Sequence, residues 1–160
     1  MILTEEQLRA VGETIGRGVG RPVFFALRGE LGAGKSVFAR AVARGAGVEG
    51  TVPSPTFNLR FDHPLPDGGQ LVHMDLYRLS EVDEIWELAW EDLGAAGELA
   101  LVEWPGRAEP FLPVDRWEVR LAPVPGHPLR REVKLAARGD PAPLPLLPEF
   151  EQSSRGEARP

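Results

Sequence analysis

Hydrophobic positions along the chain follow two patterns, one typical of amphipathic helices and one of buried strands. Between Thr4 and Gly16 apolar residues recur at helical spacing, and Thr4-Glu5-Glu6-Gln7 has the form of a capping box, so a helix is predicted there. Val23 to Leu27 is apolar throughout, as expected of a strand covered on both faces of a parallel sheet. Ser36 to Ala46 carries an apolar stripe that predicts a second helix, and glycines follow it.

The middle of the chain is predicted to form a hairpin followed by a helix. Residues 51–57, stiffened by prolines, lead into an extended segment that reaches Asp62. After a turn rich in Pro and Gly, a strand from Gln70 to Asp75 returns beside that segment. A helical pattern opened by Ser80 then runs to Leu93.

The last third of the chain is predicted to add three strands and a tail. Leu99 to Glu103 is an apolar run that ends on a carboxylate. Trp117 to Leu121 and Glu132 to Ala136 are joined by a turn rich in Pro and Gly, so these two strands are predicted to be antiparallel. Residues 139–160 are rich in Pro, Glu, Arg and Ser, and we expect a loosely docked or disordered tail after a domain of residues 1–138.

Composition narrows the class of protein. The chain has 160 residues, a one-domain length, and no cysteine, which excludes disulfides and thiolate metal sites. With no signal-like segment and no apolar run near the ~20 residues of a membrane helix, we expect a soluble, cytoplasmic protein. The net charge of −6 disfavours direct tight binding to nucleic acid, and the densest basic spot is Arg130-Arg131 with Lys134.

One segment carries the chemistry of phosphate binding. Gly29-Glu30-Leu31-Gly32-Ala33-Gly34-Lys35-Ser36 fits the pattern G-x-x-x-x-G-K-[ST] and lies between a predicted strand and a predicted helix. Glycines let backbone N–H groups surround phosphate oxygens, and the start of the helix attracts anions. Lys35 adds a positive charge, and Ser36 offers a hydroxyl to Mg²⁺. A simple glycine turn is the alternative, but the flanking strand and helix favour a nucleotide.

Strands that alternate with helices around such a loop predict an α/β fold. The expected arrangement is a P-loop NTPase-like three-layer fold with a mixed, mainly parallel central sheet. In sheets of this kind, ligands bind at the carboxyl ends of the strands. Residues that end strands are therefore the candidates for chemistry.

Two carboxylates end predicted strands. Nucleotide hydrolysis needs a carboxylate that holds Mg²⁺ beside the loop hydroxyl and a group that places the attacking water. Asp75 and Glu103 can fill these two roles. Either residue alone is also compatible with a helix cap or a surface position, and the sequence does not decide which of the two handles the water.

Two further residues lie where a nucleotide site would need them. Thr56 is in the loop bracketed by prolines after the first strand-helix unit, where switch segments sense a terminal phosphate through a hydroxyl. A turn threonine fits the same pattern. Trp104 lies between Glu103 and Pro105, which favours a place at the rim of the site, with a core aromatic as the alternative.

Four motifs follow one another along the chain. They are the loop Gly29 to Ser36, then Ser54-Pro55-Thr56-Phe57, then His73-Met74-Asp75-Leu76-Tyr77-Arg78-Leu79, then Val102-Glu103-Trp104-Pro105. In this order they resemble the bacterial TsaE family, also called YjeE, over Leu3 to about Ala137. The resemblance implies an ATPase required for threonylcarbamoyladenosine modification of tRNA. It also implies TsaB and TsaD as protein partners, with tRNA reached only indirectly and no membrane involved.

The resemblance further implies roles for individual residues. Leu31 to Ser36 would bind the phosphates of ATP or ADP. Ser36 and Glu103 would hold Mg²⁺, Asp75 would assist hydrolysis, and Thr56 would belong to a switch loop.

Other positions match the family less directly. Trp104 corresponds to the family's tryptophan beside the site, and Glu6 and Arg131 are the nearest matches to its remaining nucleotide contacts. Val37 departs from many members, which have a threonine after the loop. Since Ser36 already supplies the hydroxyl that faces the metal, we expect little loss of function from this departure.

Two other functions stay open. A small-molecule kinase would need an acceptor pocket and an arginine-bearing lid, and the stretch from Glu103 to Asp115 offers only Arg107. A nucleotide-dependent binding module would bind nucleotide through the same loop but never hydrolyse it. Because no arginine finger is obvious, the isolated chain is expected to hydrolyse ATP slowly until partners complete its site.

Overall fold

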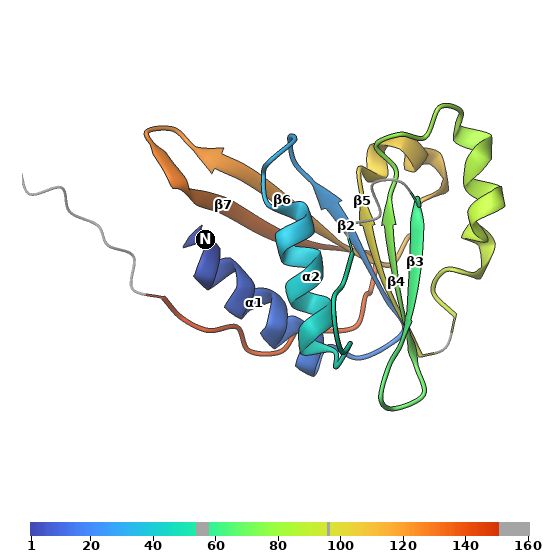
Figure 1. Ribbon diagram of the computed structural model, residues 1–160, viewed down its shortest axis with the longest axis horizontal. Coiled ribbons are helices and arrows are strands. Elements are labelled where there is room, and N and C mark those ends of the chain that lie inside the picture. The colour runs from blue at the N-terminus through green and yellow to red at the C-terminus, as the bar shows by residue number, and fades with distance from the viewer. Residues whose placement is uncertain (54–57, 96, 151–160) are drawn as a thin grey trace, which may run out of the picture.

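A seven-stranded mixed sheet forms the middle layer of the computed structural model, which describes residues 1–53, 58–95 and 97–150 (Figure 1). The strands, in sheet order, are β1 (Ile2–Thr4), β7 (His127–Arg138), β6 (Arg116–Val124), β2 (Val23–Arg28), β5 (Glu98–Glu103), β4 (Gln70–Asp75) and β3 (Arg60–Pro64). The pairings β6·β2, β2·β5 and β5·β4 are parallel, and the three outer pairings are antiparallel. The predicted α/β fold with a mixed sheet is confirmed, although parallel pairings make up half of the sheet rather than most of it.

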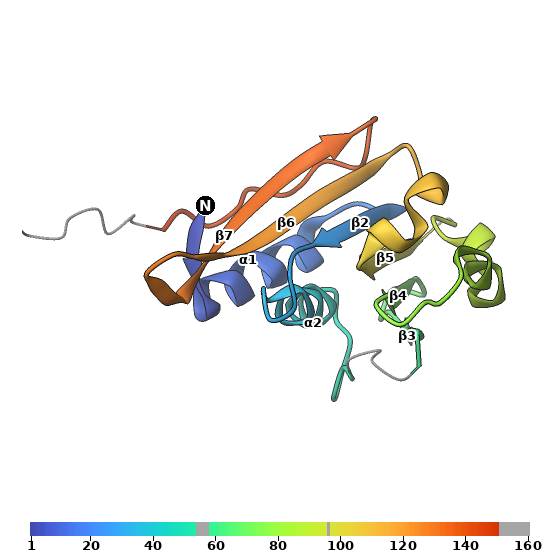
Figure 2. The ribbon, with the colours of Figure 1, turned by 90° about the horizontal axis from the view of Figure 1, so that it is seen from above.

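Helices cover both faces of this sheet and complete the three layers (Figure 2). α1 (Glu5–Gly18) and α2 (Lys35–Gly45) pack on one face. Three short 3₁₀ helices, η1 (Val82–Leu88), η2 (Trp90–Asp92) and η3 (Pro105–Phe111), pack on the other. Within the described residues, no helix is long and apolar enough to cross a membrane.

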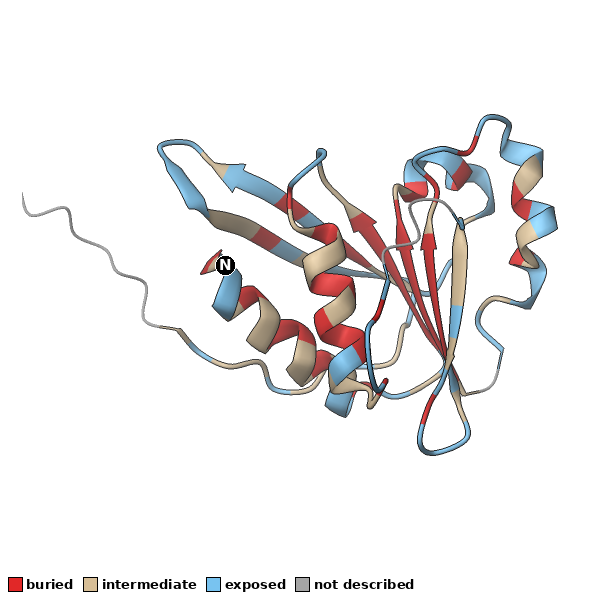
Figure 3. Cartoon of the chain, in the orientation of Figure 1, coloured by how far each residue is buried: buried red, intermediate tan, exposed pale blue. Residues whose placement is uncertain are grey.

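The central strand β2 is apolar on both sides because it serves two cores. Phe25 and Leu27 pack with residues of α1 and α2. Phe24 and Ala26 point the other way and pack with residues of the 3₁₀ helices. The central strands are accordingly buried along their length (Figure 3). This explains why the sequence shows a continuous apolar run rather than an alternating one.

The start of α1 follows the predicted capping box. Thr4 Oγ1 accepts the Gln7 N–H at 3.3 Å, and Gln7 Oε1 accepts the Thr4 N–H at 2.9 Å. The helix runs past the predicted end at Gly16 because this glycine packs against α2. A Cβ on Gly16 would lie 2.0 Å from the carbonyl oxygen of Val42, so the residue permits close helix contact. The short strand β1 before α1 was not predicted.

The predicted helix over residues 80–93 is wrong in type and continuity. The segment forms η1 and η2, separated by Ala89 in a left-handed conformation with φ of 51°. Ile85 and Trp90 are both buried against the sheet. They are five residues apart, which is about 140° around an α-helix, so one straight α-helix could not bury both. The cap is also Glu81, paired with Glu84, rather than Ser80.

The described part of the tail, up to residue 150, docks on the face that carries α1. Four apolar side chains pack against that core: Ala142, Leu144, Leu147 and Phe150. Trp117 Nε1 donates to the carbonyl oxygen of Ala142 at 2.9 Å. Leu146, in the same segment, is 98% exposed. These partly buried side chains and the hydrogen bond from Trp117 hold this segment to the core.

Candidate functional site

The loop between β2 and α2 has the backbone of an anion cradle. Gly34 precedes α2 with φ of 104°, a left-handed conformation that glycine adopts without strain. Gly34 has no side chain that could cap the first turn of α2. The N–H groups at this end of the helix can therefore donate to an anion, which the helix dipole also favours.

A pocket of about 390 Å³ over this loop collects most of the candidate residues. Those that line it are Leu31, Gly32, Gly34, Lys35, Ser36, Asp75, Glu103 and Trp104, and Val37, Tyr77 and Arg78 complete the lining. They meet because β2, β5 and β4 are parallel neighbours whose carboxyl ends lie at one edge of the sheet. Asp75 and Glu103 are direct partners in the β4·β5 register.

The ammonium group of Lys35 is buried and held by the loop itself. Nζ donates to the carbonyl oxygens of Gly29 and Glu30 at 2.7 and 2.8 Å. It also lies 4.1 Å from the centre of the Trp104 ring, which is within range of a cation–π interaction. Burial lowers the pKa of Lys35, while the carboxylates of Glu103 and Asp75 oppose this shift.

The two carboxylates at the edge of the sheet have different partners. Glu103 Oε2 accepts a hydrogen bond from Ser36 Oγ at 2.9 Å. Asp75 Oδ1 accepts the Tyr77 N–H at 2.9 Å. Burial raises the pKa of Asp75 above its ordinary value, and the hydrogen bond from Tyr77 offsets only part of that rise. A raised pKa makes the Asp75 carboxylate, when it is ionised, a stronger base for a proton from water.

The donor atoms around Ser36 suit Mg²⁺ bound together with phosphate. In nucleotide sites this ion takes one or two protein oxygens and completes its shell with phosphate oxygens and water. Ser36 Oγ and the Glu103 carboxylate, already 2.9 Å apart, are such oxygens. Across the described ranges, no group of three or more His, Cys, Asp or Glu side chains could hold a metal. The residues fit a magnesium–nucleotide complex rather than a metal centre made by protein alone.

Trp104 forms one wall of the pocket in a strained backbone conformation. Its φ of 56° is in the left-handed region, which costs a bulky residue about 1–3 kcal/mol. The ring packs against Tyr77, with 4.8 Å between the ring centres, and covers Lys35. The surrounding contacts therefore hold the tryptophan at the rim, where the sequence placed it.

The remaining candidates lie beside the pocket or outside the described residues. Glu6 and Arg131 line a second pocket of about 440 Å³, which borders the first at the loop. Arg131 Nη2 is 3.5 Å from the carbonyl oxygen of Gly32. Ala33 is buried, lines neither pocket, and donates its N–H to the Glu30 carbonyl at 3.1 Å. Thr56 lies outside the described residues, so its expected place in a switch loop stays a prediction.

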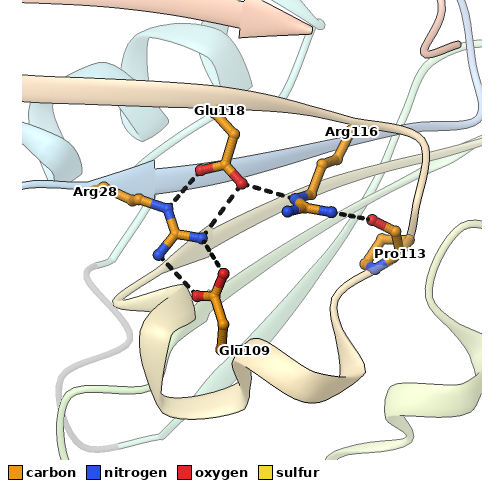
Figure 4. Close-up of polar contacts among 5 residues, drawn as sticks. All are labelled: Arg28, Glu109, Pro113, Arg116 and Glu118. Atoms are coloured by element: carbon orange, nitrogen blue, oxygen red, sulfur yellow. Dashed lines mark hydrogen bonds and ion pairs between the residues drawn. The ribbon is translucent and has the colours of Figure 1, made fainter. Parts of the chain in front are cut away.

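A network of ion pairs fixes the strand end that leads into the loop (Figure 4). Arg28, the last residue of β2, donates to both carboxylate oxygens of Glu118 and pairs with Glu109 of η3 at 2.9 Å. Arg116 Nε donates to Glu118 at 2.7 Å, and Arg116 Nη1 donates to the Pro113 carbonyl. The network joins β2, β6 and η3 immediately before the phosphate loop.

Replacing Glu118 with glutamine is expected to destabilise the fold by about 3 kcal/mol at pH 7, because two arginines then lose a buried anionic partner. Burial opposes ionisation of Glu118, but hydrogen bonds from Arg28 and Arg116 outweigh it and lower the pKa of this carboxyl. A depressed pKa means that the stabilisation is complete above the ordinary value of 4.5 and declines as the pH falls below it.

Urea unfolding of the parent chain and of Glu118→Gln between pH 7 and pH 3 measures the difference in their free energies of unfolding. We expect this difference to become smaller as the pH falls. Glu132→Gln is the matched control, since Glu132 pairs with Lys134 on the surface and should cost well under ~1 kcal/mol. A difference that stays constant with pH would contradict the assignment to Glu118 ionisation.

Three residues that touch the site belong to the third motif, but sequence reasoning assigned them no individual role. Tyr77 and Arg78 line the pocket, and His73 binds Glu103 from beneath. Tyr77 and Arg78 could have been found from the sequence, because they come shortly after the strand that ends at Asp75, at the edge of the sheet where ligands bind. His73 had a weaker signal: it is two residues before Asp75, so it shares the same face of β4.

Comparison with known proteins gives a consistent result for sequence and fold. The family model described as "Threonylcarbamoyl adenosine biosynthesis protein TsaE" matches residues 2–132. Among curated relatives named tRNA threonylcarbamoyladenosine biosynthesis protein TsaE, the one from Streptomyces coelicolor is 43% identical over 97 residues, which cover 59% of this chain and 65% of the relative. The one from Haemophilus influenzae is 34% identical over 87 residues, which cover 54% of each chain.

These alignments span less than two thirds of the relatives' own length. A solved structure extends the comparison to most of the fold. The crystal structure of Bacillus subtilis YdiB superposes with a TM-score of 0.67 and 27% sequence identity, and the match covers 87% of this chain and 84% of that one.

Proposed function

Because the chain belongs to the TsaE family, we propose that it is a Mg²⁺-dependent ATPase that supports threonylcarbamoyladenosine modification of tRNA. The observation that carries this proposal is the meeting of Lys35, Ser36, Asp75 and Glu103 in one pocket on a phosphate-binding loop. A lysine and a hydroxyl alone would suit binding. Two carboxylates beside them supply the groups that hydrolysis requires.

The loop and the start of α2 bind the phosphates of ATP or ADP in this proposal. Backbone N–H groups between Leu31 and Ser36 donate to phosphate oxygens, except that of Ala33, which the Glu30 carbonyl already holds. Lys35 exchanges its loop carbonyls for the terminal phosphates. The second pocket, lined by Glu6 and Arg131, lies next to the loop and takes the rest of the nucleotide. The Trp104 ring forms the wall of the first pocket beside the bound phosphates.

Ser36 and Glu103 hold Mg²⁺ in this site. When bound, the ion neutralises charge that develops on the phosphate oxygens during transfer. Asp75 positions the attacking water and accepts a proton from it, because its Oδ1 is held by Tyr77 and burial raises its pKa. This division leaves Glu103 to the metal, since its Oε2 already faces Ser36.

We propose TsaB and TsaD as the protein partners and the cytoplasm as the compartment, both from family membership. With a net charge of −6, the chain itself repels the phosphate backbone of tRNA. Contact with tRNA is therefore expected through the partners. Thr56 is proposed to act in a switch loop that reports the nucleotide state to them.

Phosphate release and nucleotide binding, measured on the same samples, test this proposal against its two rivals. We expect calorimetry to detect ADP and ATP binding that Mg²⁺ strengthens, and phosphate to appear from ATP without any acceptor molecule. A kinase would transfer the phosphate to an acceptor once one is present, so release that needs no acceptor, and that partners increase, counts against a kinase. A binding module would bind nucleotide but leave phosphate release unchanged in Asp75→Ala and Glu103→Ala, and that result would refute hydrolysis at this site.

A further inference from the structure

His73 is a polar residue in a place that apolar residues otherwise occupy. It lies in β4, is fully buried, and pairs in register with Leu101 of β5. On the same face of the sheet, Leu71 and Leu101 belong to the core beneath α2. A buried polar side chain costs about 1–3 kcal/mol where its hydrogen bonds are incomplete. Packing alone therefore favours an apolar residue at this position.

The hydrogen bonding of His73 is directed at one residue. Nε2 lies 2.9 Å from Glu103 Oε1, and an ionised carboxylate only accepts, so Nε2 carries the proton and donates. Nδ1 is buried and has no hydrogen-bond partner among the described residues. The side chain thus leaves one nitrogen unsatisfied while it holds the carboxylate with the other.

Glu103 is consequently fixed by both of its oxygens. Oε1 accepts from His73, and Oε2 accepts from Ser36 Oγ, each at 2.9 Å. A glutamate has three side-chain torsions, and an unsupported one would sample several rotamers at the end of its strand. Because Oε1 is hydrogen-bonded to His73, Oε2 is the oxygen that remains for an ion next to the Ser36 hydroxyl.

We propose that His73 is a positioning residue that locks the Glu103 carboxylate and thereby prepares the Mg²⁺ site. The inference rests on the proposed magnesium–nucleotide site but not on hydrolysis. Replacing a residue that hydrogen-bonds to a metal ligand commonly lowers the affinity of the site for the metal by about 10- to 100-fold. A residue that merely fills the core would change stability without changing how nucleotide binding depends on Mg²⁺.

Two polar variants and one apolar variant separate these roles. His73→Gln keeps an N–H donor near the position of Nε2, whereas His73→Asn is one methylene shorter and cannot reach Glu103 in the same way. His73→Met fills the space without a donor. His63→Met is the matched control. Among the described residues, a buried nitrogen of His63 on the neighbouring β3 also has no hydrogen-bond partner, and His63 is not hydrogen-bonded to Glu103.

The experiment titrates each protein with ADP in EDTA and at increasing Mg²⁺, and records a melting temperature without ligand. We expect all variants to bind ADP within about twofold of the parent chain in EDTA. His73→Met and His73→Asn should need at least about 10-fold more Mg²⁺ than the parent chain to strengthen ADP binding to the same extent. His73→Gln should have a Mg²⁺ requirement close to that of the parent chain. The Mg²⁺ requirement of His63→Met should not change.

Equal Mg²⁺ requirements for His73→Met, His73→Asn and the parent chain would overturn the proposal. A weaker ADP affinity that is the same with and without Mg²⁺ would also overturn it, because it would indicate a packing defect. If His73→Met does not fold, the comparison of His73→Asn with His73→Gln decides. Failure of the parent chain to bind ADP would instead refute the proposed function.

Discussion

Replacing Lys35 with methionine is expected to weaken ATP binding by about 10³-fold and to abolish phosphate release. A unit charge pair at 4 Å contributes about 4 kcal/mol at an effective dielectric of ~20, and each 1.4 kcal/mol corresponds to a factor of ten. Lys35 is the cation that the structure already holds inside the loop, between two carbonyl oxygens and the Trp104 ring. Methionine keeps a similar length and loses the charge.

Calorimetry with ATP in the presence of Mg²⁺ and a phosphate-release assay measure this effect. The chain has only two lysines, which provides a matched control. Lys134 lies on β7, is 66% exposed and pairs with Glu132, so Lys134→Met removes the same charge from the protein without touching the site. ATP binding that Lys35→Met and Lys134→Met weaken equally would show that net charge, rather than the loop lysine, governs affinity.

Much of the fold could be predicted because its periodic signals are strong and local. The capping box at Thr4, the apolar run of β2 and the hairpin of β3 and β4 each predict one element without reference to the rest of the chain. Elements that depend on tertiary packing were missed. β1 is three residues long and pairs with the edge that β7 offers. η1 and η2 take the place of one α-helix because Ile85 and Trp90, five residues apart, are both buried in the same core.

Most residues of the site could also be predicted from the sequence. A phosphate loop fixes one strand end, and parallel neighbours must end at the same edge, so Asp75 and Glu103 could be placed beside the loop before any coordinates. The sequence could not give their separate roles, because these depend on which oxygen each neighbour occupies. Ser36 and His73 divide the oxygens of Glu103, whereas Tyr77 takes one oxygen of Asp75.

Arginines near the pocket are relevant to how fast the site can turn over. Within the described residues, Arg78 lines the phosphate pocket and Arg131 lines the adjacent one. Arg131 donates to the carbonyl oxygens of Pro128 and Arg130, which anchors it at the β6–β7 end. Arg78 is exposed at the rim. Neither position is enclosed in the way that a charge-stabilising group at a transferring phosphate must be.

Hydrolysis by the isolated chain is therefore expected to be slow, and the proposed partners TsaB and TsaD are expected to raise its rate by about 10³-fold or more. An arginine supplied by a partner contributes about 10³ to 10⁵ in rate in other nucleotide hydrolases, because it stabilises charge on the transferring phosphate. The rim of the pocket is exposed at Tyr77 and Arg78, so a partner can approach that phosphate from solvent.

Single-turnover phosphate release, with the chain alone and with each partner singly and together, measures the stimulation. A complex assembled with the Lys35→Met chain is the control, and it should release no phosphate above background, which assigns the activity to this pocket rather than to a partner. Equal rates for the isolated chain and the complex would mean that the site is complete by itself. Arg78 would then be the group to replace, because it is the arginine that already lines the phosphate pocket.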